Sequence, residues 1–431
     1  MRIAIVGLGT VGSGTFNVLK RNQSDIAARA GGPIQVVQVA SRRLNPACEL
    51  GDIEFTTDIM APCSNPDVDV VVELLGGTGI AADVVRSALS HGKHVITANK
   101  ALIAEQGNEL FPLAAANGVN LAFEASVAGG IPVIKAIREG LAANRILAVA
   151  GIINGTGNFI LTEMREKGRA FADVLAEAQA LGYAEADPTF DVEGIDAAHK
   201  LTILASVAFG VPLQFRAAYT EGISRIDPQD VRQAEAFGYR IKHLGITRRC
   251  ENGIELRVHP TLIPEKQLIA KVDGVMNAVM IQADALGQTL YYGAGAGSEA
   301  TASAVIADLV DIARAHRQNS SLGVPSLGYR ADALNDLKVV PINEIECAYY
   351  LRILAKDHPG VLANVAQILS RHSINIESIT QKETDEQNGL VPMILLTHRV
   401  REKDMDHVID AIEALDDVVG SVIRIRVESF S

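Results

Sequence analysis

The chain lacks several features that mark membrane, secreted and metal-bound proteins. Its 431 residues contain no tryptophan, and aromatic residues make up 4% of the sequence. No apolar run reaches the roughly 20 residues that a membrane-spanning helix needs. The first residues, MRIAIVGLG, begin a strand at once, without an n-region, an apolar h-region and a cleavage site in sequence. We therefore predict neither a signal peptide nor a membrane partner.

The net charge and the cysteine content narrow the possible functions of the protein further. The formal net charge of −12 argues against a general role on nucleic acids or membrane surfaces. The four cysteines are scattered, and none forms a C-x-x-C pair, so the sequence suggests neither a zinc knuckle nor a redox motif. Reduced thiols in a cytoplasmic protein are the simplest interpretation.

A glycine-rich turn follows the first strand directly. Residues 2–6 have the pattern of a short buried strand, Gly7-Leu8-Gly9-Thr10-Val11-Gly12 comes next, and a helical pattern continues. This is G-x-G-x-x-G between a strand and a helix, the context that dinucleotide binding requires. The glycines permit the tight turn, the approach of a pyrophosphate and close helix packing. We predict that the cofactor contacts Gly7, Gly9, Thr10, Val11 and Gly12.

The next predicted strand, 34–40, ends in Ser41-Arg42-Arg43. NAD-binding chains usually carry Asp or Glu near this point to hold the ribose 2′-hydroxyl. A guanidinium fork fits a 2′-phosphate instead, so Arg42 and Arg43 favour NADP(H), with NAD(H) still possible. The alternative is two exposed loop arginines with no ligand.

Strands and helices then alternate through residues 68–123, which predicts a doubly wound parallel sheet in an α/β protein. Ligands of such sheets lie beyond the carboxyl ends of the strands. Lys100 follows the predicted strand 93–97 and so lies at that edge. A solvated loop lysine is the alternative.

Charges gather in the stretch AQALGYAEADPTFDVEGIDAAHK, residues 178–200, immediately before an apolar helix. Charges beside an apolar run are costly unless they are paired or used. Asp196 and Lys200 stand at i and i+4 on one predicted helical face. Several carboxylates and a lysine would suit a substrate with an ammonium group and a reactive carbonyl oxygen. The alternative is a surface ion pair worth about 0.3–0.5 kcal/mol.

This stretch resembles a family signature. The spacing of Ala178, Gly182, Asp187-Pro188, Asp191, Gly194, Asp196 and Lys200 is similar to that of homoserine dehydrogenases, and Thr97-Ala98-Asn99-Lys100 matches their T-A-N-K segment. The resemblance covers nearly the whole chain. Because no aspartate kinase region precedes it, we expect a monofunctional enzyme.

The resemblance implies reversible hydride transfer between a nicotinamide cofactor and L-aspartate 4-semialdehyde, giving L-homoserine, in threonine, methionine and isoleucine biosynthesis. Lys200 would protonate the aldehyde oxygen, and Lys100 would orient it. Glu185 and Asp196 would hold the substrate, and Asp191 would orient Lys200. The remaining contacts that the resemblance implies are Tyr183 to substrate, and Gly182, Lys100 and Gly297 to cofactor. Thr156 lies in the turn Asn154-Gly155-Thr156-Gly157-Asn158, whose amides and hydroxyl could line a substrate or nicotinamide pocket. The alternative for this turn is an ordinary helix cap.

The same resemblance implies a monovalent cation, Na⁺ or K⁺, bound mainly by backbone oxygens. Carried over by position, its ligands would be Glu124, Val127, Gly129 and Ile131. Carbonyl ligands leave no side-chain mark, so this expectation comes from the resemblance alone.

We expect three domains. A Rossmann dinucleotide domain would cover 1–130 and be completed by 295–316, and an α+β substrate and dimerisation domain would cover 131–294. A linker, 317–347, would lead to a C-terminal unit, 348–431, with ferredoxin-like β-α-β-β-α-β order. Its D-x-P-G-V-L start resembles an ACT domain, which implies a homodimer or homotetramer and feedback control by threonine. A purely structural dimerisation module is the alternative.

Two rival functions remain. The first is an NADP-dependent reductase of another amino-acid-like aldehyde. The acids between Glu185 and Lys200 disfavour a substrate that lacks an amine. The second is a non-catalytic amino-acid sensor on the same scaffold, which the presence of Lys100 together with Lys200 disfavours.

Overall fold

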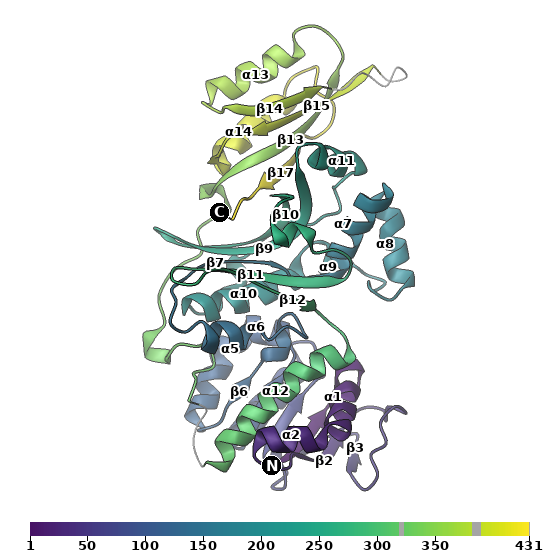
Figure 1. Cartoon of the computed structure of the whole chain (residues 1–431), viewed down its shortest axis with the longest axis vertical. Coiled ribbons are helices and arrows are strands. Elements are labelled where there is room, and N and C mark those ends of the chain that lie inside the picture. Colours follow the sequence, from purple (N-terminus) through teal and green to yellow (C-terminus); the bar gives the residue numbers. More distant parts are fainter. Residues whose placement is uncertain (319–322, 382–388, 431) are drawn as a thin grey trace.

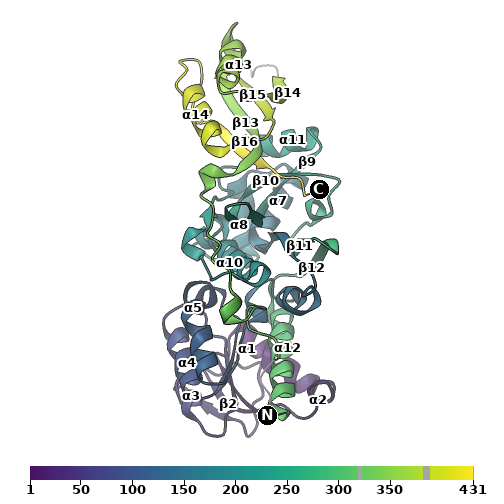
Figure 2. The same ribbon diagram turned by 90° about the vertical axis from the view of Figure 1, so that its left-hand side faces the viewer.

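A computed structural model describes residues 1–318, 323–381 and 389–430. Three units are stacked along the long axis of the molecule, from the N-terminal unit through a central unit to the C-terminal unit (Figures 1 and 2). The segment 319–322 of the expected linker lies outside the described residues. Within the described part of the chain, no helix is both long enough and apolar enough to cross a membrane.

The N-terminal unit is built on six parallel strands in the order β3-β2-β1-β4-β5-β6. The strands are β1 (Arg2–Val6), β2 (Gln35–Ala40), β3 (Glu54–Thr56), β4 (Val70–Glu73), β5 (His94–Thr97) and β6 (Leu121–Ala122). The helices around them are α1 (Thr10–Arg21), α2 (Gln23–Ala30), α3 (Ala61–Ser64), α4 (Ile80–Ser90) and α5 (Lys100–Ala116). The residues of β4 are fully buried, as expected for a parallel strand covered on both faces. The predicted doubly wound sheet is confirmed.

A late segment of the chain completes this unit. Helix α12 (Ser298–Arg317) packs against α1. A Cβ at Gly14 would lie 2.5 Å from the Ser298 carbonyl oxygen, so the glycine permits the close approach of the two helices. The Ser298 hydroxyl donates to the Thr10 carbonyl at 2.7 Å, and Arg21 pairs with Glu299 at 2.8 Å. The glycine-rich turn is therefore held from both ends of the sequence.

The central unit is a sheet with helices packed against one face. Its strands are β7 (Ile146–Ile152), β8 (Tyr219–Thr220), β9 (Tyr239–Cys250), β10 (Gly253–Pro264), β11 (Met276–Ala283) and β12 (Gly287–Ala294). Its helices are α6 (Val133–Lys135), α7 (Gly155–Lys167), α8 (Phe171–Ala180), α9 (Thr189–Val192), α10 (Ile195–Phe209) and α11 (Pro228–Ala236). Helix α10 contacts β7, β9 and β10, so its apolar faces are buried between the sheet and α5.

The β9–β10 hairpin is much longer than the sequence indicated. We predicted a strand around residues 256–259, whereas each strand has 12 residues and β10 is buried over 253–263. Buried polar side chains interrupt the apolar pattern of the hairpin, among them Lys242, His243 and Arg257. Partners of each lie on distant segments, such as Asp273 for Lys242 and Glu428 for Arg257, so local sequence patterns carry no signal that these residues are buried.

The C-terminal unit has the predicted β-α-β-β-α-β order with one extra short strand. Its elements are β13 (Glu346–Lys356), α13 (Val361–Arg371), β14 (Ile376–Gln381), β15 (Leu390–Thr397), β16 (Val400–Arg401), α14 (Glu402–Glu413) and β17 (Ile423–Val427). Short helical turns elsewhere are η1 (Glu124–Ser126), η2 (Ala136–Gly140), η3 (Phe215–Ala217), η4 (Leu268–Lys271), η5 (Ala331–Ala333) and η6 (Ile342–Glu344).

The C-terminal and central sheets are one sheet. Strand β17 pairs in parallel with β10 through Thr261 with Arg426 and Leu262 with Val427, which gives an eleven-stranded sheet. The sequence predicted two separate units here. A pairing of two residues per strand between segments about 160 positions apart has no local signal.

Candidate functional site

Two lysines from different units share one buried carboxylate. Lys200 Nζ lies 2.7 Å from Asp196 Oδ2, and Lys100 Nζ lies 3.2 Å from Asp196 Oδ1. Lys100 is the first residue of α5 and follows the carboxyl end of β5 after a two-residue turn, whereas Asp196 and Lys200 lie on α10 of the central unit. The cluster therefore spans the junction between the dinucleotide-type sheet and the central unit.

The start of α10 depends on a glycine. Gly194 precedes the helix with φ of 83°, a conformation that favours glycine. A Cβ there would lie 2.9 Å from Val258 Cγ1 and 3.2 Å from His243 Cε1. Gly194 thus lets the chain turn against the sheet and places Asp196 in the first turn of α10, one turn before Lys200.

Asn154 connects the acids of the cluster. Its side-chain oxygen caps α7 by accepting from the Gly157 amide at 2.7 Å. Its Nδ2 donates to Asp191 Oδ1 at 2.8 Å and to Asp196 Oδ2 at 2.9 Å. The neighbouring Ile153 carbonyl accepts from Lys200 Nζ at 2.7 Å. The end of β7 therefore orients both carboxylates and the ammonium group.

Burial and charge act in opposite directions on the members of this cluster. Burial alone would raise the pKa of Asp196, but the charges of Lys200 and Lys100 outweigh it and lower the pKa to about 2. Burial lowers the pKa of Lys200, and Lys100 acts in the same direction against the pull of Asp196. Burial also raises the pKa of Asp191. Lys200 is therefore a buried acid that releases its proton more easily than an exposed lysine.

Several neighbours of Lys100 were not predicted. The Phe190 ring, 40% exposed, has its centroid 5.7 Å from Lys100 Nζ. The His199 ring stacks on Phe215 at 4.0 Å, and its Nε2 lies 3.1 Å from Glu105 of α5. For Phe190, the sequence signal was an aromatic residue between Asp187 and Asp191. For His199, whose contact with Glu105 joins two units, the sequence contains no such signal.

Four predicted residues lie on or beside the loop before α9 without joining the shared carboxylate. Glu185 and Gly182 are exposed, and the Glu185 carbonyl accepts from Gln179 Nε2 at 3.0 Å. The Tyr183 ring is 44% exposed and packs edge-on against Phe159. The Thr156 hydroxyl donates to the Tyr183 carbonyl at 2.5 Å, so it anchors this loop to α7.

The glycine-rich turn has the shape of a dinucleotide cradle. A Cβ at Gly12 would lie 1.9 Å from the Gly7 carbonyl oxygen, whereas one at Gly9 would meet nothing within 4 Å. The turn is thus tightly packed beneath Gly9 and open above it, as a bound pyrophosphate requires. Arg42 and Arg43 are exposed just beyond the end of β2, within reach of solvent. Gly297, the predicted late contact, precedes α12 with φ of 132°.

The loop expected to hold a cation has a tightly wound backbone. Ala128 and Gly129 have φ of 53° and 41°, and a Cβ at Gly129 would lie 2.6 Å from the Gly295 carbonyl oxygen. The side chain of Glu124 accepts from the amides of Ile134 and Lys135 at 3.0 and 2.8 Å. Burial, with Asp308 nearby, raises the pKa of Glu124 to about 8. The Ile131 carbonyl accepts from the Val133 amide at 2.8 Å.

The carbonyls of this loop, rather than its side chains, remain the candidate ligands. Among the residues that the structure describes, no group of three or more His, Cys, Asp or Glu side chains could hold a metal ion.

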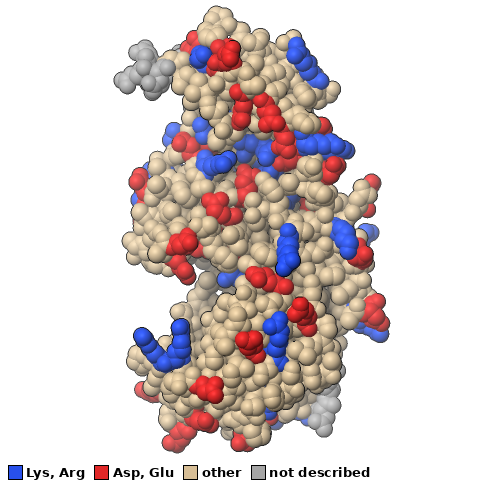
Figure 3. All heavy atoms as spheres, turned by 180° about the vertical axis from the view of Figure 1, so that it is seen from behind, with Lys and Arg blue, Asp and Glu red and all other residues tan. Residues whose placement is uncertain are grey.

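Figure 3 shows that acidic and basic side chains are interspersed over the back of the molecule, and that the outline is notched where the N-terminal unit meets the central unit.

Comparison with known proteins decides the family. The profile described as homoserine dehydrogenase matches residues 132–310, and that family's NAD-binding domain matches residues 7–124. A homoserine dehydrogenase of Pseudomonas aeruginosa is 66% identical over 431 residues, which cover 100% of this chain and 99% of the relative. The chain belongs to the homoserine dehydrogenase family. It is accordingly an oxidoreductase that acts on a CH–OH group with NAD(P).

Other homoserine dehydrogenases agree along the full length. The relative from Neisseria gonorrhoeae is 53% identical and covers 100% of this chain and 99% of its own. A crystal structure of a homoserine dehydrogenase from Thiobacillus denitrificans is 57% identical, with a TM-score of 0.95, and covers 100% of this chain and 99% of its own. The ACT domain profile matches residues 349–417, which confirms the predicted nature of the C-terminal unit.

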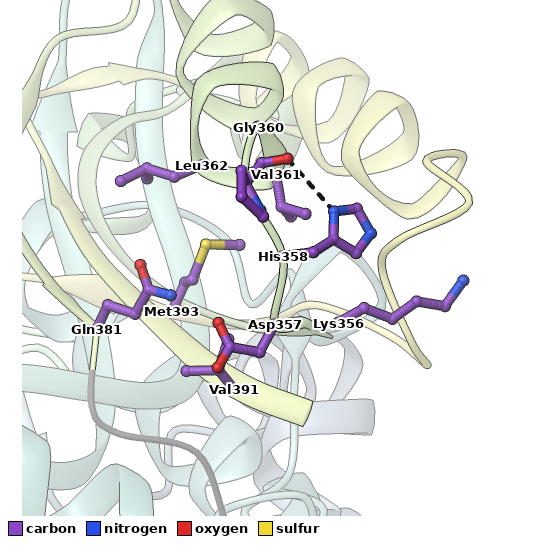
Figure 4. Close-up of a pocket in the computed structure, with 10 residues that line it drawn as sticks. Lys356, Asp357, His358, Gly360, Val361, Leu362, Gln381, Val391 and Met393 are labelled. Carbon is purple, nitrogen blue, oxygen red and sulfur yellow. Dashed lines mark hydrogen bonds between the residues drawn. The ribbon is translucent and has the colours of Figure 1, made fainter. Parts of the chain in front are cut away.

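The ACT domain carries a pocket of about 360 Å³ at the turn between β13 and α13. Figure 4 shows that the turn at His358 and Gly360 forms one wall, whereas Gln381, Val391 and Met393 come from the sheet. His358 Nε2 lies 2.9 Å from Asp417 Oδ1. The backbone carbonyl of Pro359 and the Asp417 carboxylate raise the pKa of His358.

Proposed function

We propose that this homoserine dehydrogenase reversibly reduces L-aspartate 4-semialdehyde to L-homoserine, with NADP(H) preferred over NAD(H). The reaction would serve threonine, methionine and isoleucine biosynthesis. One observation carries the proposal: two lysines share Asp196 beside the carboxyl edge of the dinucleotide-type sheet, at 2.7 and 3.2 Å. Ligands of such sheets bind along that edge.

The chemistry follows from the charges. When bound, the nicotinamide supplies a hydride to the carbonyl carbon of the aldehyde. Lys200 donates its Nζ proton to the carbonyl oxygen as negative charge develops there. The lowered pKa of Lys200 makes that transfer easier at neutral pH. Lys100 adds a second positive charge beside the oxygen, and Asp196 holds both ammonium groups in place.

The acids favour a substrate with an amine. The carboxylates of Asp191 and Asp196 lie side by side, because both accept from Asn154 Nδ2. A substrate ammonium group can pair with them there. Glu185, on the exposed loop beside Tyr183, reaches the same ammonium group if that loop folds over the bound substrate. This preference disfavours aldehydes that lack an amino group.

The cofactor preference rests on Arg42 and Arg43 beyond the end of β2. A solved structure of a hyperthermophilic archaeal homoserine dehydrogenase in complex with NADPH is 26% identical to this chain, with a TM-score of 0.62. Arg42→Asp should raise the Kd of NADPH about tenfold or more and change the Kd of NADH little, because only NADPH carries the 2′-phosphate.

Fluorescence titration of both cofactors measures this preference. Arg29→Asp on α2 makes the same charge change at another exposed position and should affect both cofactors slightly. If Arg42→Asp weakened the binding of NADPH and NADH equally, the proposal that Arg42 binds the 2′-phosphate would be wrong.

Regulation belongs to the ACT domain. We place threonine, as feedback inhibitor, in the pocket at the β13–α13 turn, whose ammonium-accepting and carboxylate-binding groups would come from that turn. The ACT domain is tied to the central unit by the Arg426–Glu221 pair at 2.7 Å. Glu221 lies three residues before Ser224, whose hydroxyl donates to Glu193 at 2.9 Å, directly before Gly194. A change in the ACT domain thus has a contiguous route to the start of α10.

Three further expectations complete the proposal. A Na⁺ or K⁺ ion would be held by the carbonyls of Glu124, Val127, Gly129 and Ile131, a loop whose strained backbone is typical of functional sites. Edge strands β12 and β14 offer pairing edges for a homodimer or homotetramer. Free cysteines, three of them buried, agree with a cytoplasmic enzyme. The domain limits 1–130 with 295–316, 131–294, 317–347 and 348–431 are proposed on the same grounds.

The deciding experiment is an assay of NADPH oxidation with L-aspartate 4-semialdehyde, with and without threonine. Steady turnover that threonine lowers would support both the reaction and its regulation. A series of aldehydes with and without the amino group separates this substrate from other amino-acid-like aldehydes. Binding of threonine without any NADPH oxidation would instead identify a sensor, and would overturn the proposal.

A further inference from the structure

Glu73 is a buried acid that the proposed reaction does not use. It is the last residue of β4 and has no exposed surface. Its Oε1 accepts from the amides of Leu75 and Gly76 at 2.7 and 3.3 Å, and its Oε2 accepts from the Thr97 hydroxyl at 2.6 Å. One carboxylate therefore joins the loops that follow β4 and β5.

The contacts continue from Thr97 to the active lysine. The Thr97 hydroxyl oxygen accepts from the Asn99 amide at 3.0 Å. Asn99 Oδ1 caps α5 by accepting from the Leu102 amide at 3.1 Å, and α5 begins at Lys100. Because the hydroxyl donates its hydrogen to Glu73, its lone pair stays turned toward Asn99. The orientation of the first turn of α5 thus depends on the Glu73 carboxylate.

A second branch closes the network on the cofactor side. Asn99 Nδ2 donates to the Gly77 carbonyl at 2.6 Å. Gly76 and Gly77 are exposed and have φ of 78° and 74°. A Cβ built at either position would have no neighbouring atom within 4 Å. These glycines line open space at the edge of the sheet where the dinucleotide would lie. A Cβ at Gly7 would meet the Leu74 carbonyl at 2.6 Å, so the first glycine turn also packs on this loop.

We propose that Glu73 is a positioning residue that locks the glycine loop after β4 to the start of α5, and so fixes Lys100 relative to the bound dinucleotide. The inference rests on the proposed role of Lys100. Its physical basis is that a carboxylate accepts at both oxygens, whereas an amide cannot. With glutamine at this position, either the backbone amides lose their acceptor or the Thr97 hydroxyl must turn away from it.

The test is a double-mutant cycle with Glu73→Gln and Lys100→Ala, read by kcat for semialdehyde reduction and by the Kd of NADPH. In the parent background, Glu73→Gln should lower kcat about tenfold and raise the Kd severalfold, since it breaks buried hydrogen bonds at one of the two oxygens. In the Lys100→Ala background it should leave kcat within about twofold while still raising the Kd.

Each outcome has a distinct meaning. If Glu73→Gln lowers kcat by the same factor in both backgrounds, it acts by general damage, and the inference is overturned. If it changes neither constant in the parent, the inference is also overturned. Lys100→Ala that retains parental turnover would instead refute the proposed function of Lys100, independently of Glu73.

Thr97 provides a second route if Glu73→Gln folds poorly. Thr97→Ser keeps the hydroxyl and should retain the parental kcat and Kd, whereas Thr97→Val should reproduce both changes. Gln38→Leu removes another buried polar side chain from the same sheet, one that pairs with Glu54 at 2.9 Å, and should leave both constants unchanged. Equal behaviour of the Ser and Val variants would contradict the assigned role of the hydroxyl.

Discussion

Two ionic clusters contain similar residues but differ in how firmly their basic side chains hold their protons. In the substrate cluster, Lys200 and Lys100 share Asp196. At the junction between the ACT domain and the central unit, Arg257 on β10 pairs with Glu428 and with Glu255, the latter at 2.7 Å. The first cluster lies at the edge of the dinucleotide sheet, where Lys100 is partly exposed, whereas Arg257 and Glu428 of the second are buried inside a continuous sheet.

Their protonation differs in kind. At the junction, burial alone would lower the pKa of Arg257, but Glu428 and Glu255 outweigh it and raise the pKa above its ordinary value. Burial would raise the pKa of Glu428, yet Arg257 and Arg248 lower it to about 2. Arg257 and Glu428 are thereby held in their charged forms. In the substrate cluster the pKa of Lys200 is lowered, so its proton is held less firmly.

Hydrogen bonding explains the difference. Arg257 donates from Nε to Glu255 at 2.9 Å and from a terminal nitrogen toward His259 at 2.6 Å, and Arg248 donates to the second oxygen of Glu428 at 2.8 Å. A guanidinium with this many partners cannot serve as an acid. A lysine beside a carboxylate shared with a second cation can. The Arg257 cluster therefore stabilises the fold, whereas in the proposed function the charges of the Lys200 cluster take part in the reaction.

The largest expected effect is on turnover. Lys200→Ala should lower kcat about 10²–10⁴-fold and leave the Kd of NADPH nearly unchanged, because it removes the proton donor without touching the glycine turn. Lys242→Met removes a different buried lysine, whose pKa burial lowers to about 8, and should reduce the melting temperature while leaving kcat within a few-fold. Turnover of Lys200→Ala within a few-fold of the parent would refute the assignment.

The next effect is on stability. Arg257→Met should cost about 3–5 kcal/mol of unfolding free energy, because it removes the buried partner that Glu428 and Glu255 share and leaves both with Arg248 alone. Chemical denaturation with a matched kcat measurement checks this, and we expect the folded variant to keep its turnover.

Adding Glu428→Gln sharpens the test. The double variant should be less destabilised than the sum of the two single changes, since it also removes the buried charge that had lost Arg257 as a partner. Strict additivity would mean that Arg257 and Glu428 do not act as a pair.

A smaller effect is expected for Asp191→Asn. Asp191 accepts from Asn154 at 2.8 Å and faces Lys200 without sharing its closest ion pair. Loss of its charge should lower kcat/KM for the semialdehyde about tenfold, mainly through KM, if it contacts the substrate ammonium group. Steady-state kinetics separate the two constants. A change confined to kcat would assign Asp191 to Lys200 instead of to the substrate.

The smallest perturbation is pH itself. In the proposed reaction protonated Lys200 is the acid, so the rate of aldehyde reduction should be flat at low pH and fall as pH rises through the pKa of Lys200, which lies below the ordinary 10.5. Homoserine oxidation needs the unprotonated form and should rise over the same range. Profiles of both directions, with the kcat of Lys200→Ala as reference, test the sign. A reduction rate that increased with pH would exclude Lys200 as the acid.

Local patterns predicted much of this molecule. The Gly7–Gly12 turn, the alternation of strands and helices, and the i, i+4 pair of Asp196 and Lys200 all depend on neighbours within a few residues. The structure shows the same elements in the same order. The lysine after the strand ending at Thr97 was also placed at the correct edge of the sheet.

Contacts between distant segments could not be predicted in the same way. Nothing in the spacing says that Lys100 pairs with a residue 96 positions later, or that Glu73 reaches Thr97. The β9–β10 hairpin was underestimated because its buried Lys242 and Arg257 make it look exposed. Glu185 was grouped with the other acids by sequence alone, whereas its side chain faces solvent.

The parallel pairing of β10 with β17 also determines where this chain can be shortened. A chain that stopped before β13 would leave the N–H and C=O groups of β10 open at Thr261 and Leu262 and strip Arg257 of Glu428. Open edges of this kind invite polymerisation. The ACT domain therefore covers an edge of the central sheet through β17, and the catalytic portion produced without it should be prone to form fibres.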